Sequence, residues 1–498
     1  MNSDQIKSLV TFGLCVVFAA FLGYLLANSE YGVLVWLIYL AVGMFLFFAP
    51  GYIPLMAFGL VSPINVPIPF IRQFPFVAVM LGLCLFKYMT RRWLTHMRDP
   101  SPLRLSLPIS FALFFGWVCF RYCLDPALPN VRGFGENVSG FRPYLNYAVC
   151  LGVVMLISLF FRRVDDVKSV LRWMAALATF FVILLIPLSV SKSLVVAEML
   201  TRLGVFVGFF DNGWLRFVVL PGLGTVLLVF GLLPRVSGWG RTRSRVMIGL
   251  GLVAVIMGGG RGSFLGAAAA VAAIALVRRQ LLGLTAAIAG LALLLGIFRY
   301  VGENYTFHEG AGALRILSLV SPRVADLTGA SDTVVWRQRR WERAMQDIYR
   351  RPWIGYGYGG LERAFVYGSR ADYESAKVEI DVVSGGVHNG FIAGARALGV
   401  PALGLFLVIL FGRTYSNARL GLRLRESDPE RSELHCLAFA QLAAFVPAIY
   451  IGTDLNAPML WFYLFLGVLV EGLKAREAAE EAAPAPDTAL IAPRPAVA

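Results

Sequence analysis

The residues of this sequence that could do chemistry are a few cationic and imidazole side chains in the second half of the chain. Arg261 stands between two apolar segments, and His388 with Asn389 opens a later one. An arginine at the edge of an apolar helix tends to take a counter-ion, and its planar guanidinium fits a phosphate through two parallel hydrogen bonds. Histidine transfers protons near neutral pH. Together these residues would suit binding of a phosphate ester with proton transfer beside it.

A denser group of cations lies between Arg261 and His388. From Val335 to Arg351 apolar residues recur at helical spacing while arginines occupy the other faces, which predicts an amphipathic helix. Pro352 ends this helix, and a glycine-rich turn follows. The arginines of the predicted helix are Arg337, Arg339, Arg340, Arg343 and Arg350.

Each of these features also has a purely structural interpretation. Arg261 could extend its guanidinium to lipid headgroups. The arginine-rich helix could be a solvated face held by Glu342 and Asp347. His388 and Asn389 could simply begin a helix, with Asn389 capping its free N–H groups. Taken singly, the helix start and the solvated face are the simpler interpretations.

The sequence contains no convincing nucleotide-binding or metal-binding motif. The glycines of 355–360 satisfy a dinucleotide fingerprint only formally, because a helix rather than a strand precedes them. The stretch 258–263 lacks the Lys-Ser/Thr pair of a phosphate loop, and its glycines suit close helix packing. There is no H-E-x-x-H motif and no cysteine cluster, so the sequence predicts neither a catalytic metal nor a cofactor.

The elements that must position these residues are membrane helices. The chain has 498 residues, of which 58% are hydrophobic and 15% charged. This composition predicts an all-α, polytopic membrane protein with roughly 12 to 14 crossings. The net charge of +15 comes from short loops between apolar runs, where topology explains it, so nucleic-acid binding is not expected. The predicted spans are Ser8–Ala27, Tyr31–Phe48, Phe74–Met89, Leu107–Leu124, Tyr144–Phe161, Met174–Val190, Leu215–Leu233, Val246–Gly260, Gly262–Val277, Leu281–Phe298, Gly390–Gly412, Cys436–Ile451 and Pro458–Leu473.

The short basic loops fix a predicted orientation. They all fall on one side if the 281–298 helix runs outward, and that side is then cytoplasmic. The proline-broken stretch 50–70 could be a short span or a re-entrant segment, and parity with an inside N-terminus requires it to cross. The large hydrophilic loop then faces the periplasm. We therefore predict four parts: an N-terminal transmembrane bundle (1–298), a large periplasmic loop (299–389), C-terminal transmembrane helices (390–473) and a disordered cytoplasmic tail (474–498).

Three stretches together resemble the O-antigen ligase family of membrane glycosyltransferases. They are Gly260-Arg-Gly-Ser-Phe-Leu-Gly266, the run from Arg337 to Ala344 continued by Arg351-Pro-Trp-Ile-Gly-Tyr-Gly-Tyr-Gly359, and His388-Asn-Gly-Phe391. The resemblance covers roughly 246–410. It departs from the family's pattern at Gly260, where the family has serine, and at Ala397, where it often has an acidic residue.

The resemblance implies a glycosyltransferase C-type fold in the bacterial inner membrane and a periplasmic active site. It implies that Arg261 and Arg337 bind the pyrophosphate of an undecaprenyl-linked glycan and that His388 acts at the acceptor hydroxyl, without a metal and with inversion. The acceptor would be lipid A core or another glycan. Glu379 or Asp381 is an alternative base. The substrate-binding residues expected from the same motifs are Arg340, Trp341, Arg343, Tyr356, Gly357 and Asn389.

Several activities fit such a chain. A ligase attaches finished glycan to its acceptor, whereas a polymerase of the same family adds glycan to glycan. A lipid-linked glycan flippase would also be basic and polytopic, but should carry its charges in a cavity among the spans. A non-catalytic scaffold would use the amphipathic loop helix for docking. We favour the ligase.

Overall fold

The computed structural model describes residues 51–62, 65–68, 71–95, 107–126, 140–189, 197–198, 200–201, 207–209, 215–304, 321–327, 330–358, 373–383, 386–452 and 454–482. The two predicted spans before residue 50 lie outside this described part of the chain.

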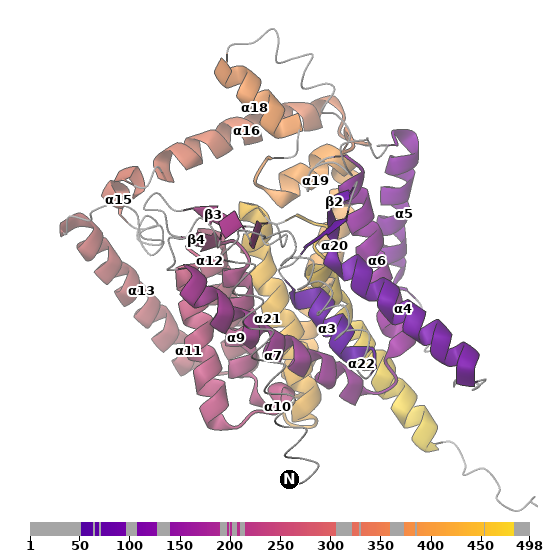
Figure 1. The fold of residues 1–498 in the computed structure, drawn as a ribbon. Helices are drawn as coiled ribbons and strands as arrows, with labels where there is room; N and C mark the ends of the chain where they lie inside the picture. The colour runs from indigo at the N-terminus through magenta and orange to yellow at the C-terminus, as the bar shows by residue number, and fades with distance from the viewer. Residues whose placement is uncertain are drawn as a thin grey trace, which may run out of the picture.

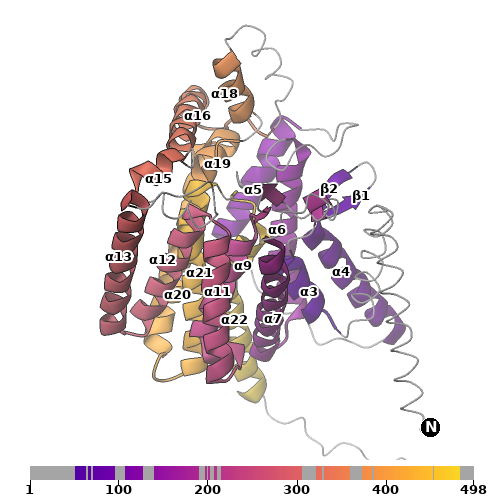
Figure 2. The same ribbon diagram turned by 60° about the vertical axis from the view of Figure 1, so that its left-hand side comes forward.

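The chain is an all-helical, polytopic membrane protein. Five of the described helices are long and apolar enough to cross a membrane: α6 (Phe141–Phe160), α7 (Val164–Ser189), α20 (Val400–Leu424), α21 (Pro429–Ile451) and α22 (Pro458–Ala482). They run through a bundle seen from two sides in Figure 1 and Figure 2. The other membrane-associated helices are α4 (Phe76–Thr95), α5 (Ile109–Leu124), α9 (Leu220–Leu232), α11 (Arg241–Met257), α12 (Arg261–Val277) and α13 (Leu281–Asn304).

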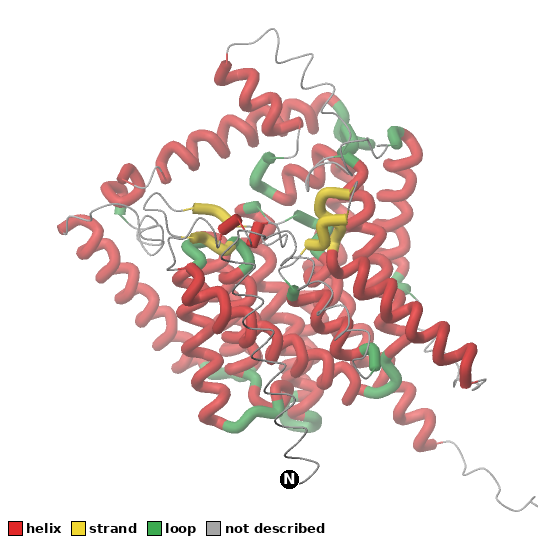
Figure 3. The backbone as a smooth tube through the Cα atoms, in the orientation of Figure 1, coloured by secondary structure: helices red, strands yellow, loops and turns green. Residues whose placement is uncertain are grey.

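Two predicted crossings contain short strands. The 50–70 stretch forms the nine-residue helix α3 (Ile53–Val61), followed by the hairpin of β1 (Asn65–Ile68) and β2 (Ile71–Pro75). A helix of nine residues is about 13 Å long, so α3 alone does not span the apolar layer of about 30 Å. The 215–233 run divides into β4 (Leu215–Phe217), which pairs with β3 (Val207–Phe209), and α9. Both hairpins stand out among the helices in Figure 3.

The predicted 390–412 span is two helices rather than one. The nine-residue α19 (Gly390–Leu398) ends at Gly399, whose φ of +88° is left-handed, and α20 begins at once with Pro401 in its first turn. Apolar residues run through the break, so hydropathy did not reveal it. The backbone geometry of glycine and the missing N–H of proline stop one helix and start the next.

Helix α22 extends beyond the predicted end of its span. It continues through residues 474–482, where a disordered tail was expected. Ion pairs at helical spacing join Lys474 to Glu477 and Arg476 to Glu480. Such pairs, with several alanines, favour helix in a polar segment.

The two ends of the bundle differ in what they carry. The loop helices α15 (Pro322–Leu327), α16 (Ala330–Arg350) and α18 (Tyr373–Val383) lie with α19 at one end, which we call the loop end. The connection that includes α10 (Pro234–Ser237) lies at the other, which we call the basic end (Figure 1). Glu433 of α21 pairs with Arg278 and accepts from the Arg235 N–H of α10, so the basic connections after α12, before α21 and at α10 meet at this end.

Helices α12 and α21 pack closely against each other as they approach the loop end. A Cβ built on Gly262 would lie 3.0 Å from the Ile451 Cβ atom, and one on Gly266 would lie 2.7 Å from the Ala444 carbonyl oxygen. Small residues therefore let these helices touch, as the alternative interpretation of the glycines predicted. This contact places the start of α12 beside the end of α21.

Candidate functional site

The amphipathic helix α16 is held over the loop end by ion pairs to α18. Arg343 donates from Nε and Nη2 to the two oxygens of Glu379, at 2.5 and 2.7 Å. Arg340 pairs with Asp381 and also donates to the Gly386 carbonyl oxygen at 3.3 Å. A two-pronged arginine-carboxylate pair is directional, so these bonds fix the register between the two helices.

Asp347 connects α16 to α19. It is 3% exposed and accepts from Arg343 Nη1 at 2.5 Å and from Arg396 Nε at 2.8 Å. A buried carboxylate requires such partners, because leaving it unpaired would cost several kcal/mol. The arginines and carboxylates of this set, Arg340, Arg343, Arg396, Asp347, Glu379 and Asp381, form what we call the loop network.

Helix α16 contacts the segment that precedes His388. Val387 is fully buried and packs with Ala344 and Val382. The Trp341 indole donates to the Val387 carbonyl oxygen at 3.0 Å, and its ring meets that of Tyr450 at a centroid distance of 5.6 Å. Trp341 therefore joins the loop helix, the His388 segment and the end of α21.

His388 has an unusual backbone. Its φ is +52°, in the left-handed region that side chains other than glycine adopt rarely. Asn389 then caps α19, its side chain accepting from the backbone N–H groups of Phe391 and Ile392 at 3.1 Å each, as predicted. Held strain of this kind concentrates at functional sites. The interpretation of this dipeptide as a helix start is thus correct for Asn389, while His388 carries a conformation that capping does not require.

Two cations act on the His388 ring. The protein packed around the ring displaces water, and the nearby charges of Arg340 and Arg337 act in the same direction, so the pKa of His388 is lowered. Asp381 opposes this shift. The lowered pKa favours the neutral ring, which is the form that can accept a proton.

Arg337 differs from Arg340 and Arg343 in its lack of a described carboxylate partner. Its Nε atom, like that of Arg340, is buried without a hydrogen-bond partner. Burial and the adjacent charge of Arg340 lower the pKa of Arg337, because both disfavour the cation. A guanidinium in this position is complementary to an anion supplied from outside the protein.

Arg261 reaches the same region from the membrane side. It begins α12, and its neighbour Gly262 touches Ile451 at the end of α21. One residue further, a Cβ built on Gly452 would lie 3.7 Å from the His388 Nδ1 atom. Arg261 and His388 therefore border the same helix end, and Arg261 has an interaction partner of its own.

The glycine-rich turn after α16 packs against the end of α19. Tyr356 and Gly357 donate their N–H groups to the carbonyl oxygens of Arg396 and Ala397, each at 2.8 Å. The Tyr356 ring lies against the guanidiniums of Arg351 and Arg396, with centroid distances of 4.8 and 5.7 Å. A Cβ on Gly357 would lie 2.6 Å from Arg121 Nη2. We call this contact between the glycine-rich turn and the end of α19 the clasp.

Sequence reasoning missed one carboxyl group near the site. Asp454 follows α21 and, with Tyr358 and Gly390, lines a cavity behind α19. Burial raises the pKa of Asp454 to about 6. No described residue forms an ion pair or hydrogen bond with its carboxylate. Its only sequence signal was an acidic residue between two apolar runs. The expected alternative bases, Glu379 and Asp381, are instead bound in the loop network.

The structure thus divides the sequence-predicted residues into three groups. His388, Arg337 and Arg340 lie together, with Arg261 at the edge. Arg343, Trp341 and Asn389 make the supporting contacts described above, and Tyr356 with Gly357 belongs to the clasp. Among the described residues, no group of three or more His, Cys, Asp or Glu side chains could hold a metal ion.

Comparison with known families agrees with the motifs. Residues 246–407 match the model of the family described as O-Antigen ligase. No curated protein matches the sequence. The match begins in α11 and ends in α20, so it includes Arg261, the loop network and His388. The family comprises ligase-type and polymerase-type glycosyltransferases that act on lipid-linked glycans. Residues 246–407 of this multi-pass membrane protein are therefore similar to the O-antigen ligase family.

Proposed function

We propose that the chain transfers a glycan from undecaprenyl pyrophosphate to an acceptor hydroxyl at the loop end, as an O-antigen ligase. The observation that carries the proposal is the partly buried Arg337 beside His388, with no carboxylate among the described residues to balance its charge. Arg340 and Arg343, by contrast, are balanced by carboxylates.

The proposed reaction is a single displacement with inversion. The acceptor oxygen attacks the C1 atom of the sugar, the bond from C1 to the phosphate oxygen breaks, and undecaprenyl pyrophosphate leaves with the electron pair. Arg337, with Arg261 from α12, stabilises the negative charge that grows on the leaving group. His388 takes the proton of the acceptor hydroxyl. Arg340 touches both Gly386 and Asp381 and so positions His388 rather than binding donor.

The proposed orientation places the loop end in the periplasm of a bacterial inner membrane. At the basic end, Glu433 accepts from the Arg235 N–H of α10 and pairs with Arg278, and Arg431 pairs with Glu471. Short basic connections are retained on the cytoplasmic side of membranes. Undecaprenyl-linked glycan would then enter from the outer leaflet, and the acceptor would be lipid A core or a comparable envelope glycan.

The test uses a deletion strain that is complemented with wild type, His388→Ala, Arg337→Ala or Arg339→Ala. Arg339 is an exposed neighbour on the same helix and serves as the matched control. A ligase predicts long glycan stranded on the lipid carrier and a bare acceptor in the first two variants, with wild-type transfer in Arg339→Ala. Single repeats joined to the acceptor would instead identify a polymerase. Undiminished transfer in Arg337→Ala would remove the site assignment.

A further inference from the structure

A second uncompensated arginine lies at the basic end, remote from the loop network. Arg413 is on α20 and, with Ser416, Asn417 and Leu420, forms one wall of a groove of about 400 Å³. The opposite wall is α22, through Val468 and residues near it. The groove uses none of the residues assigned to glycan transfer.

The level of this groove in the membrane follows from where charged residues begin on α20 and α22. Helix α20 has no charged residue from Val400 to Gly412, and α22 has none from Pro458 to Val470. The side chains just beyond these runs meet one another: His435 bonds Asn417 Oδ1 and Glu471 Oε1 at 2.8 Å each. The groove therefore lies where the apolar layer ends, which is the level of lipid headgroups.

The charges in the groove leave a net positive site. Glu471 lines it but accepts from Arg431 Nε at 2.7 Å and bonds His435. Arg413 stacks on the Phe111 ring with a centroid distance of 5.6 Å, and no described carboxylate pairs with it. A cation held on an aromatic face beside a neutralised carboxylate attracts an anion.

The surroundings favour a lipid as the source of that anion. Leu420 and Val468 line the groove beside the polar groups. On α5, which supplies Phe111, Ile109 is 78% exposed and Leu113 is 55% exposed. Acyl chains could lie along this apolar surface while a phosphate reaches Arg413. We infer that the groove between α20 and α22 binds the phosphate headgroup of an anionic phospholipid, with Arg413 as its principal ligand.

The test measures binding to the purified full-length protein, stripped of lipid in a neutral detergent, by native mass spectrometry during titration with phosphatidylglycerol. Loss of one charge-assisted contact predicts an affinity about 10-fold or more lower for Arg413→Ala than for wild type. Arg419→Ala, an exposed arginine on the same helix, should stay within about 2-fold. Ser416→Phe keeps the cation but fills the groove, and should lose binding as well. Helical content by circular dichroism checks that each variant is folded.

The competing ligands separate the sources of phosphate. Phosphatidylcholine should bind far more weakly than phosphatidylglycerol, and glycerol 3-phosphate or inorganic phosphate should not displace the lipid. Equal binding of phosphatidylcholine would contradict an anion site. Displacement by free phosphate would overturn the lipid assignment, and unchanged affinity in both Arg413→Ala and Ser416→Phe would overturn the groove itself.

Discussion

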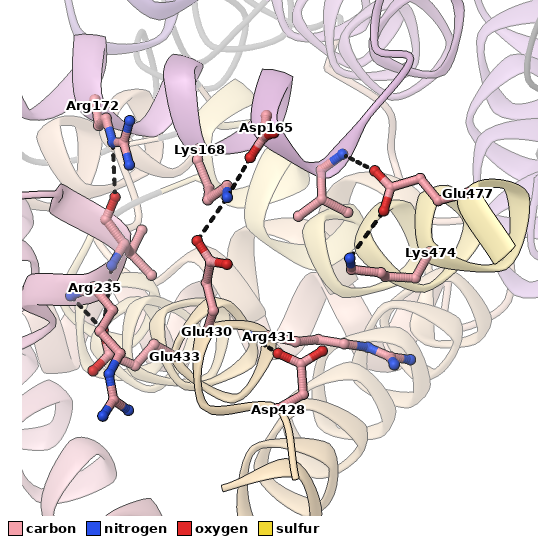
Figure 4. Close-up of polar contacts among 12 residues, drawn as sticks. Asp165, Lys168, Arg172, Arg235, Asp428, Glu430, Arg431, Glu433, Lys474 and Glu477 are labelled. Atoms are coloured by element: carbon pink, nitrogen blue, oxygen red, sulfur yellow. Dashed lines mark hydrogen bonds and ion pairs between the residues drawn. The ribbon is translucent and has the colours of Figure 1, made fainter. Parts of the chain in front are cut away.

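The two ends of the bundle are built from the same kinds of residue but use them differently. At the basic end, the lysines drawn in Figure 4 are matched by acids: Lys168 pairs with Asp165 and Glu430, and Lys474 pairs with Glu477. At the loop end, the loop network is balanced in the same way, but Arg337 stands beside it without a carboxylate among the described residues.

This difference separates cations that hold the fold from cations that can act on a ligand. The charge of a paired guanidinium is balanced by its carboxylate. A guanidinium without such a partner, close to a histidine, can instead stabilise negative charge that develops during a reaction. The number of arginines in the sequence does not distinguish the two cases, whereas the partners of each arginine in the structure do.

The largest effect should come from removing the unbalanced cation. Arg337→Ala should lower the transfer rate by about 10²- to 10³-fold, because one preorganised donor to the leaving group is lost. Arg337→Lys should recover only part of it, since an ammonium cannot form the two-pronged contact. Both rates are measured with lipid-linked donor in proteoliposomes. Equal losses in Arg337→Ala and Arg339→Ala would show that Arg337 has no special role among the arginines of α16.

Breaking a balanced pair should instead affect stability, more at the loop end than at the basic end. Arg343→Ala leaves Asp347, whose side chain is 4% exposed, short of a partner and should cost about 3 kcal/mol. Lys168→Ala should cost under about 1 kcal/mol, because Asp165 and Glu430 are well exposed. Denaturant titration gives both values. Similar costs for the two variants would show that burial of Asp347 does not matter.

Asp454 belongs to neither network, and its neutral replacement should stabilise the protein. Because burial raises the pKa of Asp454 to about 6, the folded state holds the proton more tightly than the unfolded state. The stability that this carboxyl contributes is therefore lost as pH rises from about 4 through 6. Asp454→Asn cannot ionise and should be more stable than wild type at pH 7.5 by up to about 2 kcal/mol. The two proteins should unfold alike near pH 4; a constant difference across this range would refute the ionisation.

The smallest effect concerns the charge that Arg337 exerts on the histidine. The pKa of His388 is lowered in part by Arg337, so Arg337→Gln should raise that pKa toward its ordinary value. The acidic limb of the pH–rate profile should then move to higher pH, and the variant should lose additional activity, up to about 10-fold, at pH 6 relative to pH 8. Arg337→Lys keeps the charge and should leave the limb in place. A limb at the same pH in all three proteins would mean that His388 does not set it.

Much of the fold could be predicted because span length and apolar character are local properties. Helix α16 lies where its spacing predicted it, and Asn389 caps α19 as its side chain suggested. The break at Gly399 was missed because Leu398 and Val400 continue the apolar run. The extension of α22 was missed because its stability comes from ion pairs rather than hydropathy.

The site was predictable in its members but not in their roles. Motif order pointed to Arg337, Arg343 and His388 alike. What separates Arg343 from Arg337 is Glu379, which lies 36 residues further along the chain and meets Arg343 only because α18 folds back on α16. Pairings across such a distance depend on tertiary packing, which the sequence does not display.

The clasp around α19 also determines when during synthesis the site can exist. Tyr358 contacts Tyr147, 211 residues earlier, and the Trp117 indole donates to the Leu398 carbonyl oxygen, 281 residues later. The Cys150 thiol reaches the Asn456 carbonyl oxygen across 306 residues. Helices α5 and α6 are thus inserted long before their partners are translated. A nascent chain that stops at residue 407, the end of the family match, would carry every candidate side chain yet lack α21, whose Tyr450 and Gly452 back the Trp341 and His388 positions.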